Sequence, residues 1–291
     1  MPEGHTLRRL ANELSAAFAG RPVRVSSPQG RFAADAGLLD GETVASADSA
    51  GKHLFVEFAG ERFVHVHLGL IGSFDVHTGA ATVPPPVGQV RLRLVAVDGD
   101  PAAQADAATA SYADLRGATQ CDLIGPEKRD AIIARLGPDP LRADADPERA
   151  WRRISRSHRP IGDLLMDQEV IAGVGNVYRA EVLFRHRMHP LRPGETLRRG
   201  QFRAVWDDLV ELMTEGVATG RIDTVRPQHT PEAMGRPPRR DDHGGEVYVY
   251  RRTGQPCHVC GKKVRTEVLV GRNLFWCPGC QPRFRSRATH S

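Results

Sequence analysis

The sequence lacks any long apolar run. None of its 291 residues belongs to an unbroken stretch of the roughly 18 apolar residues that a membrane-spanning helix needs. The first ten residues, MPEGHTLRRL, also lack the apolar core of a secretory signal. These two absences argue against a membrane anchor and against export, and we expect the protein in the cytoplasm.

Cysteine is scarce, with five residues in the chain. A small, odd number is not typical of a secreted domain held together by disulfides. With 40% hydrophobic and 26% charged residues, the composition is that of a globular protein. The length exceeds that of one small domain, so we expect two or three structural units and a sizeable core.

Charge is distributed unevenly along the chain. Residues 1–148 carry 14 basic and 20 acidic side chains, residues 149–225 carry 13 and 10, and residues 226–291 carry 13 and 5. The formal net charge of these parts is −6, +3 and +8, although the whole chain has only +5. A basic rear part indicates a polyanionic partner.

The front part has one helical pattern followed by strand patterns. Apolar residues at helical spacing predict a helix over residues 7–18, which Gly20 and Pro22 would end. Alternating runs then predict strands with one buried face, as in a sandwich or barrel, at residues 54–58, 63–68 and 90–94. Residues 80–86 and 98–114 lack such periodicity, so we expect loops there.

The rear part turns to helical patterns after a proline-containing linker at residues 136–141. Helices are predicted at residues 151–157, 161–171, 177–186 and 202–217. Residues 226–246 contain four prolines and three glycines, and we expect a mobile segment there.

Four of the cysteines form two C-x-x-C pairs, separated by sixteen residues: Cys257, Cys260, Cys277 and Cys280. Two such turns can supply a tetrahedral thiolate cage, which suits Zn²⁺, and full thiolate ligation makes the ion structural. Disulfides are the alternative. The fifth cysteine, Cys121, stands alone and is interpreted as a core residue.

The segment between the cysteine pairs predicts a hairpin, with strands at residues 266–270 and 274–276. Gly271 and Asn273 tolerate a positive φ, so they would form the tip and hold Arg272 outward. In this basic segment, Arg272 is either a phosphate contact or a solvated tip residue.

A glycine-rich break, Ala172-Gly173-Val174-Gly175-Asn176, separates two helical patterns. Asn176 is placed to cap the second helix, and the free N–H groups of a first helical turn favour an anion such as phosphate. The alternative is a plain turn between helices.

The N-terminus begins Met1-Pro2-Glu3-Gly4. Removal of Met1 would expose the secondary amine of Pro2, and an α-amino group, with a reference pKa near 8, is a usable nucleophile. A secondary amine that attacks a sugar C1′ gives an iminium cation, and Glu3 could move protons at the same centre. Taken alone, a Met-Pro start more often has no such role.

Five motifs together carry a resemblance to a known family. They are Met1-Pro2-Glu3-Gly4, Gly51-Lys52-His53-Leu54, His67-Leu68-Gly69-Leu70, Gly173-Val174-Gly175-Asn176-Val177-Tyr178, and Gly271-Arg272 before the four-cysteine ribbon. Their order and spacing resemble the formamidopyrimidine-DNA glycosylase and endonuclease VIII family of bifunctional base-excision repair enzymes. The start of the chain is more similar to the endonuclease VIII branch, which the resemblance associates with oxidised pyrimidines.

The resemblance implies a multidomain α+β protein. An N-terminal catalytic β-sandwich domain with a leading helix would cover residues 2–125, and a helix–two-turn–helix DNA-binding domain residues 126–225. A mobile loop at residues 226–246 would precede a C-terminal zinc ribbon at residues 247–285. The mobile loop occupies the place of the segment that closes over a flipped base in relatives, with an unstructured linker as the alternative.

The resemblance also implies catalytic roles. Pro2 would be the Schiff-base nucleophile, and Glu3 the proton donor and acceptor in glycosylic cleavage. Lys52 would serve β-elimination and bind backbone phosphate. Arg272 would grip the phosphate and assist δ-elimination.

Further residues are implied in DNA binding. Asn176, with the N–H groups around Gly175, would hold a phosphate near the lesion, and Leu70 would fill the gap left by the flipped nucleotide. Arg116 is a candidate for a second wedge residue, with a structural surface arginine as the alternative. His65 and His67 are interpreted as solvated or core-satisfied and not as catalytic.

Departures from the family pattern concern the substrate. Gly69 and Ile71 flank Leu70 where the endonuclease VIII branch has polar or aromatic residues, which affects the expected pairing with the orphaned base. Thr6 stands where the purine-directed branch has an acidic residue, which weakens the case for 8-oxoguanine.

The predicted function is therefore a bifunctional DNA glycosylase and AP lyase. It would excise oxidised bases from damaged double-stranded DNA, as a monomer with one structural Zn²⁺, in the cytoplasm at the bacterial nucleoid. The alternative is a non-catalytic paralogue that binds damaged or structured DNA. A sequence-specific zinc-ribbon regulator is disfavoured by the N-terminal sandwich and by the lack of an obvious recognition helix.

Overall fold

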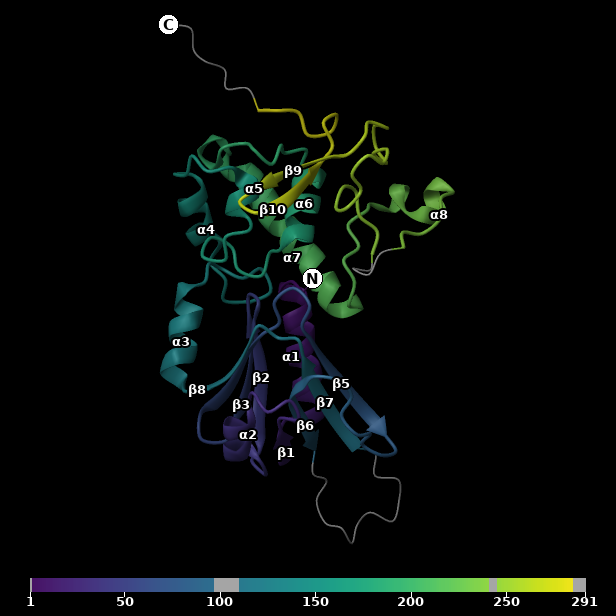
Figure 1. The fold of residues 1–291 in the computed structure, drawn as a ribbon. Coiled ribbons are helices and arrows are strands. Elements are labelled where there is room, and N and C mark those ends of the chain that lie inside the picture. The colour runs from purple at the N-terminus through teal and green to yellow at the C-terminus, as the bar shows by residue number, and fades with distance from the viewer. Residues whose placement is uncertain (1, 97–109, 241–244, 285–291) are drawn as a thin grey trace, which may run out of the picture. The chain divides into compact units, whose positions relative to one another are not determined.

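The computed structural model describes residues 2–96, 110–240 and 245–284. The chain divides into two compact units, Met1–Arg135 and Leu136–Ser291, called here the N-terminal unit and the C-terminal unit (Figure 1). The division lies ten residues beyond residue 125, where the sequence pattern places the end of the sandwich domain, because helix α3 (Pro126–Arg135) belongs to the first unit.

The N-terminal unit begins with helix α1 (Gly4–Phe18). Its buried stripe includes Leu7, Leu10 and Leu14, which pack into the core of the unit. The chain leaves the helix through Gly20, whose φ of 77° is in the left-handed region that glycine tolerates. The helix predicted at residues 7–18 is confirmed and starts three residues earlier.

Two four-stranded antiparallel sheets follow α1, in the orders β1-β6-β7-β5 and β2-β3-β4-β8. Their strands, with the short helix α2 (Ala33–Leu39), are β1 (Val23–Ser26), β2 (Val44–Ala50), β3 (His53–Phe58), β4 (Arg62–His67), β5 (Ser73–Ala80), β6 (Val90–Ala96), β7 (Ala110–Arg116) and β8 (Gln120–Ile124). Side chains from both sheets and from α1 share one apolar core. The predicted sandwich with a leading helix is confirmed.

Strand β7 corrects the end of the loop predicted at residues 98–114, of which residues 98–109 lie outside the described part of the chain. The strand pairs with both β5 and β6 and is central in its sheet. Its Asp114 is typical of a loop, but here the side chain is buried and forms a two-pronged ion pair with Arg93, at 2.7 and 2.9 Å. The sequence pattern did not indicate this strand, because the polar residue Asp114 is buried there only with the help of Arg93 on the neighbouring strand.

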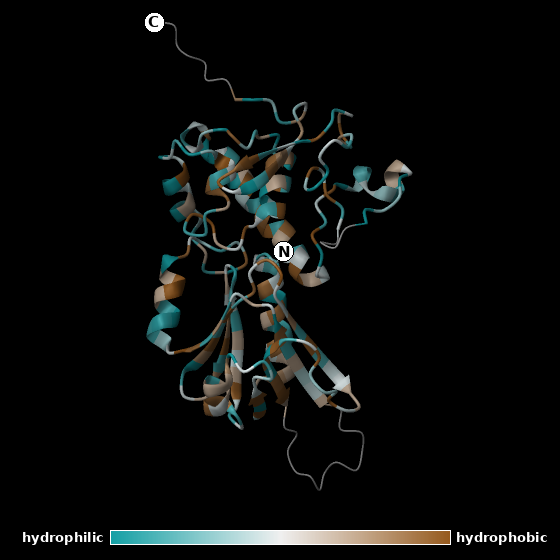
Figure 2. Cartoon of the chain, in the orientation of Figure 1, coloured by the Kyte–Doolittle hydropathy of each residue, from teal (hydrophilic) through white to brown (hydrophobic). Residues whose placement is uncertain are grey.

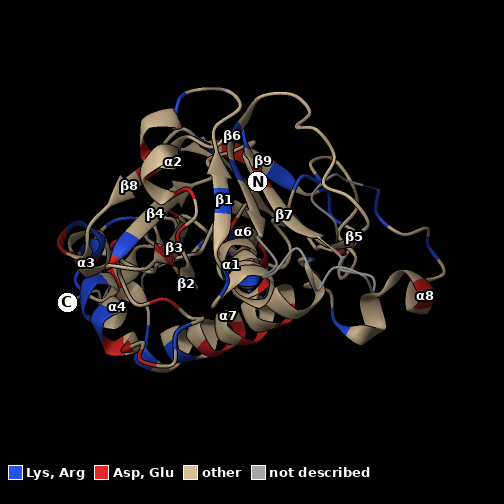
Figure 3. Ribbon diagram, turned by 90° about the horizontal axis from the view of Figure 1, so that it is seen from below, with Lys and Arg blue, Asp and Glu red and all other residues tan. Residues whose placement is uncertain are grey.

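The C-terminal unit contains helices and one small hairpin. Its elements are α4 (Pro147–Ile154), α5 (Ile161–Leu164), α6 (Asn176–Arg185), η1 (Gly194–Thr196), α7 (Arg199–Thr219), η2 (Pro227–His229), α8 (Pro231–Met234), β9 (Arg265–Leu269) and β10 (Arg272–Trp276). Figure 2 shows apolar and polar residues alternating along α7, and Figure 3 shows acidic and basic residues along the same helix. The buried side of α7 packs with α6 and the ribbon in one apolar core.

One expectation for this unit needs correction, and one stays a prediction. The helix predicted at residues 161–171 is only one turn, α5. Beyond it the backbone makes turn bonds, such as Met166 N–H to the Asp163 carbonyl at 3.0 Å, and the Gln168 carbonyl accepts the Gly137 N–H at 2.9 Å. The segment at residues 226–246, predicted to be mobile, contains η2 and α8 among its described residues.

Candidate functional site

Pro2 and Glu3 lie at the start of α1. Glu3 is the N-cap residue, with extended backbone, and it is fully buried. Its carbonyl accepts the Thr6 N–H at 2.9 Å, which fixes the first turn of the helix. A carboxylate at this position lies near the positive end of the helix dipole. The structure therefore places an acid directly beside the predicted nucleophile, Pro2, which is half-buried.

Lys52 lies in the turn between β2 and β3, where Gly51 has a φ of 57°. Burial, and then the charge of Lys52, lower the pKa of the His67 imidazole on β4.

The histidine row comprises His53, His65 and His67. His53 Nδ1 and His65 Nε2 are 2.9 Å apart and share a hydrogen bond, and the ring centroids of His53 and His67 are 5.3 Å apart. Burial lowers the pKa values of His53 and His65 to about 4, with a further contribution from neighbouring imidazoles. His65 is buried and bonds His53 through Nε2, but its Nδ1 has no hydrogen-bond partner among the described residues, so the core-satisfied interpretation fits only one of its two nitrogens.

Leu70 and Ile71 project from the loop between β4 and β5, with 61% and 87% of their surface exposed. Two glycines lie where the loop packs too closely for a larger residue. A Cβ on Gly69 would lie 2.4 Å from the Thr119 methyl carbon, and one on Gly72 would lie 2.3 Å from the Leu68 carbonyl oxygen. A closely packed loop therefore presents two apolar side chains to solvent, which suits insertion into stacked bases.

Arg116 makes contacts of a different kind. Its guanidinium pairs with Asp75 at 3.0 Å and with Asp114 at 2.8 Å, and it donates to the Val87 carbonyl. These contacts favour the structural alternative for Arg116 over a wedge role.

The glycine break differs in detail from the prediction. Gly175 is the N-cap of α6, and Asn176 is the first helical residue rather than the cap. The Asn176 side-chain oxygen accepts a hydrogen bond from Arg179 one turn later. Arg179 is fully buried and also donates to the Asn273 carbonyl at 2.8 Å.

Arg179 is a site residue that sequence reasoning missed. It connects the first turn of α6 with strand β10, so that Asn176 and the residue after Arg272 share one guanidinium. An arginine within an apolar helix gives no sequence signal for such a link, because the partner on β10, the Asn273 carbonyl, is 94 positions away.

The ribbon hairpin turns at Val270 and Gly271, with φ values of 47° and 69°. Arg272 is therefore not at the tip but is the first residue of β10, opposite Leu269. A two-residue turn with positive φ at both positions matches the right-handed twist of a hairpin. The exposed Arg272 side chain lies next to the turn, one position from where it was predicted.

The four paired cysteines form the metal site. Their sulfur atoms all lie within 4.8 Å of one another, and none of the chain's cysteines is in a disulfide. Four thiolates at this spacing fit a tetrahedral Zn²⁺, so the zinc interpretation is confirmed over disulfides. Gln281 supports the site, because it accepts the Cys277 N–H at 2.9 Å and donates to the Met188 carbonyl at 2.8 Å.

Glu181 fixes the chain ahead of the ribbon. This fully buried carboxylate on α6 accepts the backbone N–H groups of Tyr248, Val249 and Tyr250 at 2.6 to 2.9 Å. It also accepts the Thr224 hydroxyl at 2.6 Å. Through these bonds, helix α6, which also carries Asn176 and Arg179, holds both Thr224 and the segment at residues 248–250 that precedes the ribbon.

Cys121 lies in the apolar core of the N-terminal unit, where burial raises the pKa of its thiol to about 12. The interpretation as a core residue is confirmed. In the described part of the chain, no helix has the length and apolar character for a membrane span.

Family models match three parts of the chain. The formamidopyrimidine-DNA glycosylase N-terminal domain matches residues 1–121, and the H2TH domain of the same glycosylase matches residues 136–227. A zinc finger found in FPG and IleRS matches residues 254–283.

Known proteins are similar over nearly the full length. "Endonuclease 8 1" of Mycobacterium tuberculosis is 52% identical, over 97% of this chain and 100% of the relative. Formamidopyrimidine-DNA glycosylase of Thermus thermophilus is 31% identical, over 97% of each. The Lactococcus lactis Fpg structure with abasic-site DNA has the same fold, with a TM-score of 0.74 and 23% identity, over 97% of this chain and 100% of that one.

The sites, the zinc ribbon and these similarities agree with one another. The chain belongs to the formamidopyrimidine-DNA glycosylase and endonuclease VIII family of DNA repair glycosylases.

Proposed function

We propose that this protein is a bifunctional glycosylase and AP lyase that removes oxidised pyrimidines from duplex DNA. The observation that carries the proposal is the position of Pro2 directly before a fully buried Glu3 at the start of α1. A nucleophilic amine and a carboxyl group at one helix start are the two groups that the chemistry requires.

The reaction begins after removal of Met1. The Pro2 nitrogen attacks C1′ of the damaged nucleotide, the N–C1′ bond forms, and the glycosidic bond breaks with its electron pair leaving on the base. Glu3 moves the protons that ring opening and base departure require. The product is an iminium cation between Pro2 and the opened sugar.

The iminium then serves as an electron sink. Removal of a C2′ proton expels the 3′ phosphate, which is β-elimination, and a second elimination expels the 5′ phosphate. We assign the support of these steps to Lys52 and Arg272, whose cations offset phosphate charge. Water finally releases the sugar fragment and regenerates the Pro2 amine.

DNA binding uses the same two units. We assign phosphate contacts to Lys52, to Arg272 and to Asn176 with the N–H groups around Gly175. The exposed Leu70, and not Arg116, is the side chain we assign to the space left by the flipped nucleotide. We further propose that the protein acts as a monomer at the bacterial nucleoid, with a loop at residues 226–246 and a ribbon at residues 247–285.

The substrate preference follows from similarity to endonuclease VIII. The chain is 52% identical to a protein named "Endonuclease 8 1", and it begins with Pro2-Glu3-Gly4. Thr6 in place of an acidic residue supports pyrimidine rather than purine lesions. Duplexes with 5-hydroxyuracil, thymine glycol and 8-oxoguanine, compared at equal concentration, test this preference by their single-turnover rates.

Borohydride trapping tests the chemistry. The zinc-loaded protein should form a covalent adduct with a duplex that contains 5-hydroxyuracil, and Pro2→Gly should remove the adduct. Glu3→Gln should abolish base excision but retain trapping on a preformed abasic site. Absence of an adduct on every lesion and on abasic DNA, together with retained binding, would favour the non-catalytic paralogue.

A further inference from the structure

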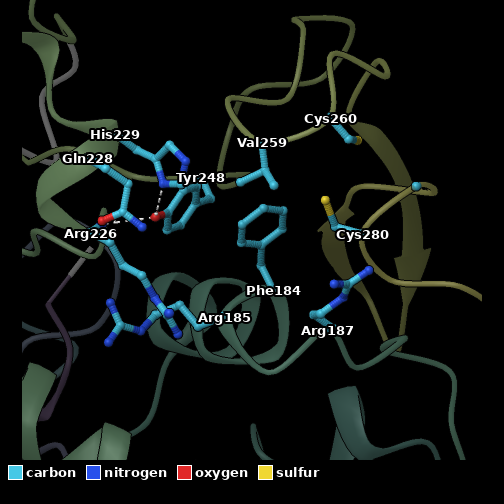
Figure 4. Close-up of a pocket in the computed structure, with 11 residues that line it drawn as sticks. Phe184, Arg185, Arg187, Arg226, Gln228, His229, Tyr248, Val259, Cys260 and Cys280 are labelled. Carbon is cyan, nitrogen blue, oxygen red and sulfur yellow. Dashed lines mark hydrogen bonds between the residues drawn. The ribbon is translucent and has the colours of Figure 1, made fainter. Parts of the chain in front are cut away.

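The C-terminal unit contains a cavity that the proposed reaction does not use. Its volume is about 360 Å³, and it lies where the end of α6, η2 and the zinc ribbon meet (Figure 4). Cys260 and Cys280 belong to one wall, so the metal site shapes it. Cavities of roughly 300–1,000 Å³ are the size of sites that hold small ligands or single large side chains.

The floor of the cavity is aromatic and apolar. Phe184 and Tyr248 stack with ring centroids 4.5 Å apart and planes inclined by 25°. Both are buried, with only 4% and 2% of their surface exposed, so neither offers a free ring face to a nucleobase. Val259 faces Phe184 across the cavity and is 53% exposed (Figure 4). An inserted aliphatic or aromatic side chain would meet apolar surface on both sides.

The rim of the cavity is cationic. Arg226 lies on one side with Gln228 and His229, and Arg187 lies on the other with Cys280 (Figure 4). Both arginines are exposed, and neither guanidinium has an ion pair or hydrogen bond with a described residue. Arg185 behind them is different, because Asp208 neutralises it at 2.6 Å. Two uncompensated cations therefore flank the apolar floor.

A hydrogen-bonded pair fixes the polar wall. The Tyr248 hydroxyl accepts a hydrogen bond from the backbone N–H of Arg226 at 2.9 Å, and it lies 2.9 Å from His229 Nδ1. This contact joins the imidazole of His229 to the hydroxyl of Tyr248, so the two side chains form one polar wall of the cavity.

We propose that this cavity binds an acidic peptide segment of a partner protein. One large apolar side chain of the segment would occupy the space between Phe184 and Val259, and flanking carboxylates would bind Arg187 and Arg226. Charge complementarity favours an anionic occupant, and the lack of a free aromatic face favours a peptide over a nucleic acid strand. The residues involved are separate from those assigned to the reaction.

Two fluorescein-labelled peptides of equal charge test this proposal by fluorescence anisotropy. One is Asp-Asp-Asp-Glu-Leu-Phe, and in the other the last two residues are serine. The zinc-loaded full chain should bind the first peptide at least about tenfold more tightly than the second. Arg187→Glu with Arg226→Glu should weaken that binding by at least about tenfold, and so should Val259→Asp.

Control variants separate the cavity from general charge. Arg31→Glu with Arg135→Glu makes the same change in net charge on exposed arginines of the N-terminal unit, and it should leave peptide binding within about twofold. Zinc content and trapping on abasic DNA should stay unchanged in all variants. If Val259→Asp loses zinc, the comparison rests on the arginine variants, whose positions are outside the metal site.

Three outcomes would overturn the proposal. Equal affinity for both peptides would mean attraction by charge alone. Absence of binding up to about 1 mM would mean that the cavity has no peptide ligand of this class. Displacement of a labelled single-stranded oligonucleotide by the peptide, with the same sensitivity to the arginine variants, would assign the cavity to nucleic acid.

Discussion

The two units differ in how they accommodate polar groups in their interiors. The N-terminal unit buries imidazoles, among them His5 and His65, whose pKa values burial lowers to about 4, and its buried ion pair of Arg93 and Asp114 joins neighbouring strands of one sheet. The C-terminal unit buries the charged side chains of Arg179 and Glu181, whose hydrogen bonds reach segments distant in sequence. The first unit is therefore sensitive to added protons, and the second to the loss of a partner or of zinc.

This difference follows from architecture. Strand pairing satisfies the backbone within the sandwich, so its interior needs few polar links between segments. The C-terminal unit joins helices to irregular chain and a small ribbon, which leaves backbone groups to be satisfied by side chains such as Glu181. Buried side chains of this kind fix the positions of the segments that they join, and the stability of the C-terminal unit therefore depends on a few residues.

Loss of zinc should have the largest effect and should affect one unit only. Cys277→Ser removes a ligand, and metal binding in zinc modules contributes on the order of 10 kcal/mol to folding. We expect the ribbon to unfold, with rapid hydrogen exchange at residues 254–283 and unchanged protection of β3 and β4. Equal loss of protection from hydrogen exchange in both units would contradict the expectation that zinc stabilises only the C-terminal unit.

Replacement of Glu181 should have the next largest effect. Glu181→Gln presents an amide N–H to backbone donors, and an unmatched buried polar group of this kind costs about 3 kcal/mol or more. The urea midpoint of the C-terminal unit should fall accordingly. Glu195→Gln is the matched control, since Glu195 is exposed and pairs only with exposed His158, and it should change stability by less than about 0.5 kcal/mol.

Acid should weaken the N-terminal unit. The pKa values of His5 and His65 are about 4 in the folded protein and near 6.5 when unfolded, so the unfolded chain binds more protons between these pH values. The free energy of unfolding should therefore fall as the pH decreases from 6.5 towards 4, by about 2 kcal/mol per histidine at pH 5. Hydrogen exchange of β3 and β4 at pH 7 and pH 5, corrected for the intrinsic rate, measures this change.

The variant His65→Phe sharpens the acid test. A phenyl ring can replace the imidazole against Phe55, whose ring centroid lies 5.0 Å away, but it cannot take up a proton. The pH dependence of the free energy of unfolding should then decrease by the contribution of one histidine. If the free energy of unfolding changes with pH as in the unsubstituted protein, His65 does not contribute to the acid sensitivity.

Leu70→Ala should have the smallest effect on stability, because the side chain is 61% exposed. We expect a change within about 0.5 kcal/mol. The single-turnover rate on duplex lesions should nevertheless fall, while trapping on a single-stranded abasic oligonucleotide should not. A loss of stability would instead make Leu70 a packing residue of the N-terminal unit.

Sequence reasoning succeeded where one local pattern determined the structure. The apolar spacing from Leu7 to Phe18 defined α1, and the C-x-x-C pairs defined the metal site. It failed where a residue depends on partners distant in sequence. Asp114 was taken as a loop residue because its partner Arg93 lies on another strand, and the helix predicted at residues 161–171 is replaced by turns in which the Gln168 carbonyl accepts the N–H of the distant Gly137.

The site was predictable to a similar extent. The motifs located Pro2, Glu3 and Asn176 near helix starts, and the structure adds that Glu3 is buried and that Asn176 lies one position inside its helix. Arg272 shifted by one residue because the turn needs only Val270 and Gly271. Arg179 could not be found, since its role exists only once α6 and β10 are side by side.

Two residues near the middle of helix α6 bind different parts of the chain. Arg179 binds β10, and Glu181 binds the segment at residues 248–250. Since these two residues lie two positions apart, about 3 Å along the helix axis, one short stretch of α6 holds both strand β10 and the segment that leads into the ribbon. A one-residue insertion or deletion between Arg179 and Glu181 should therefore break one of the two contacts, which makes this stretch the part of α6 that tolerates a change of length least.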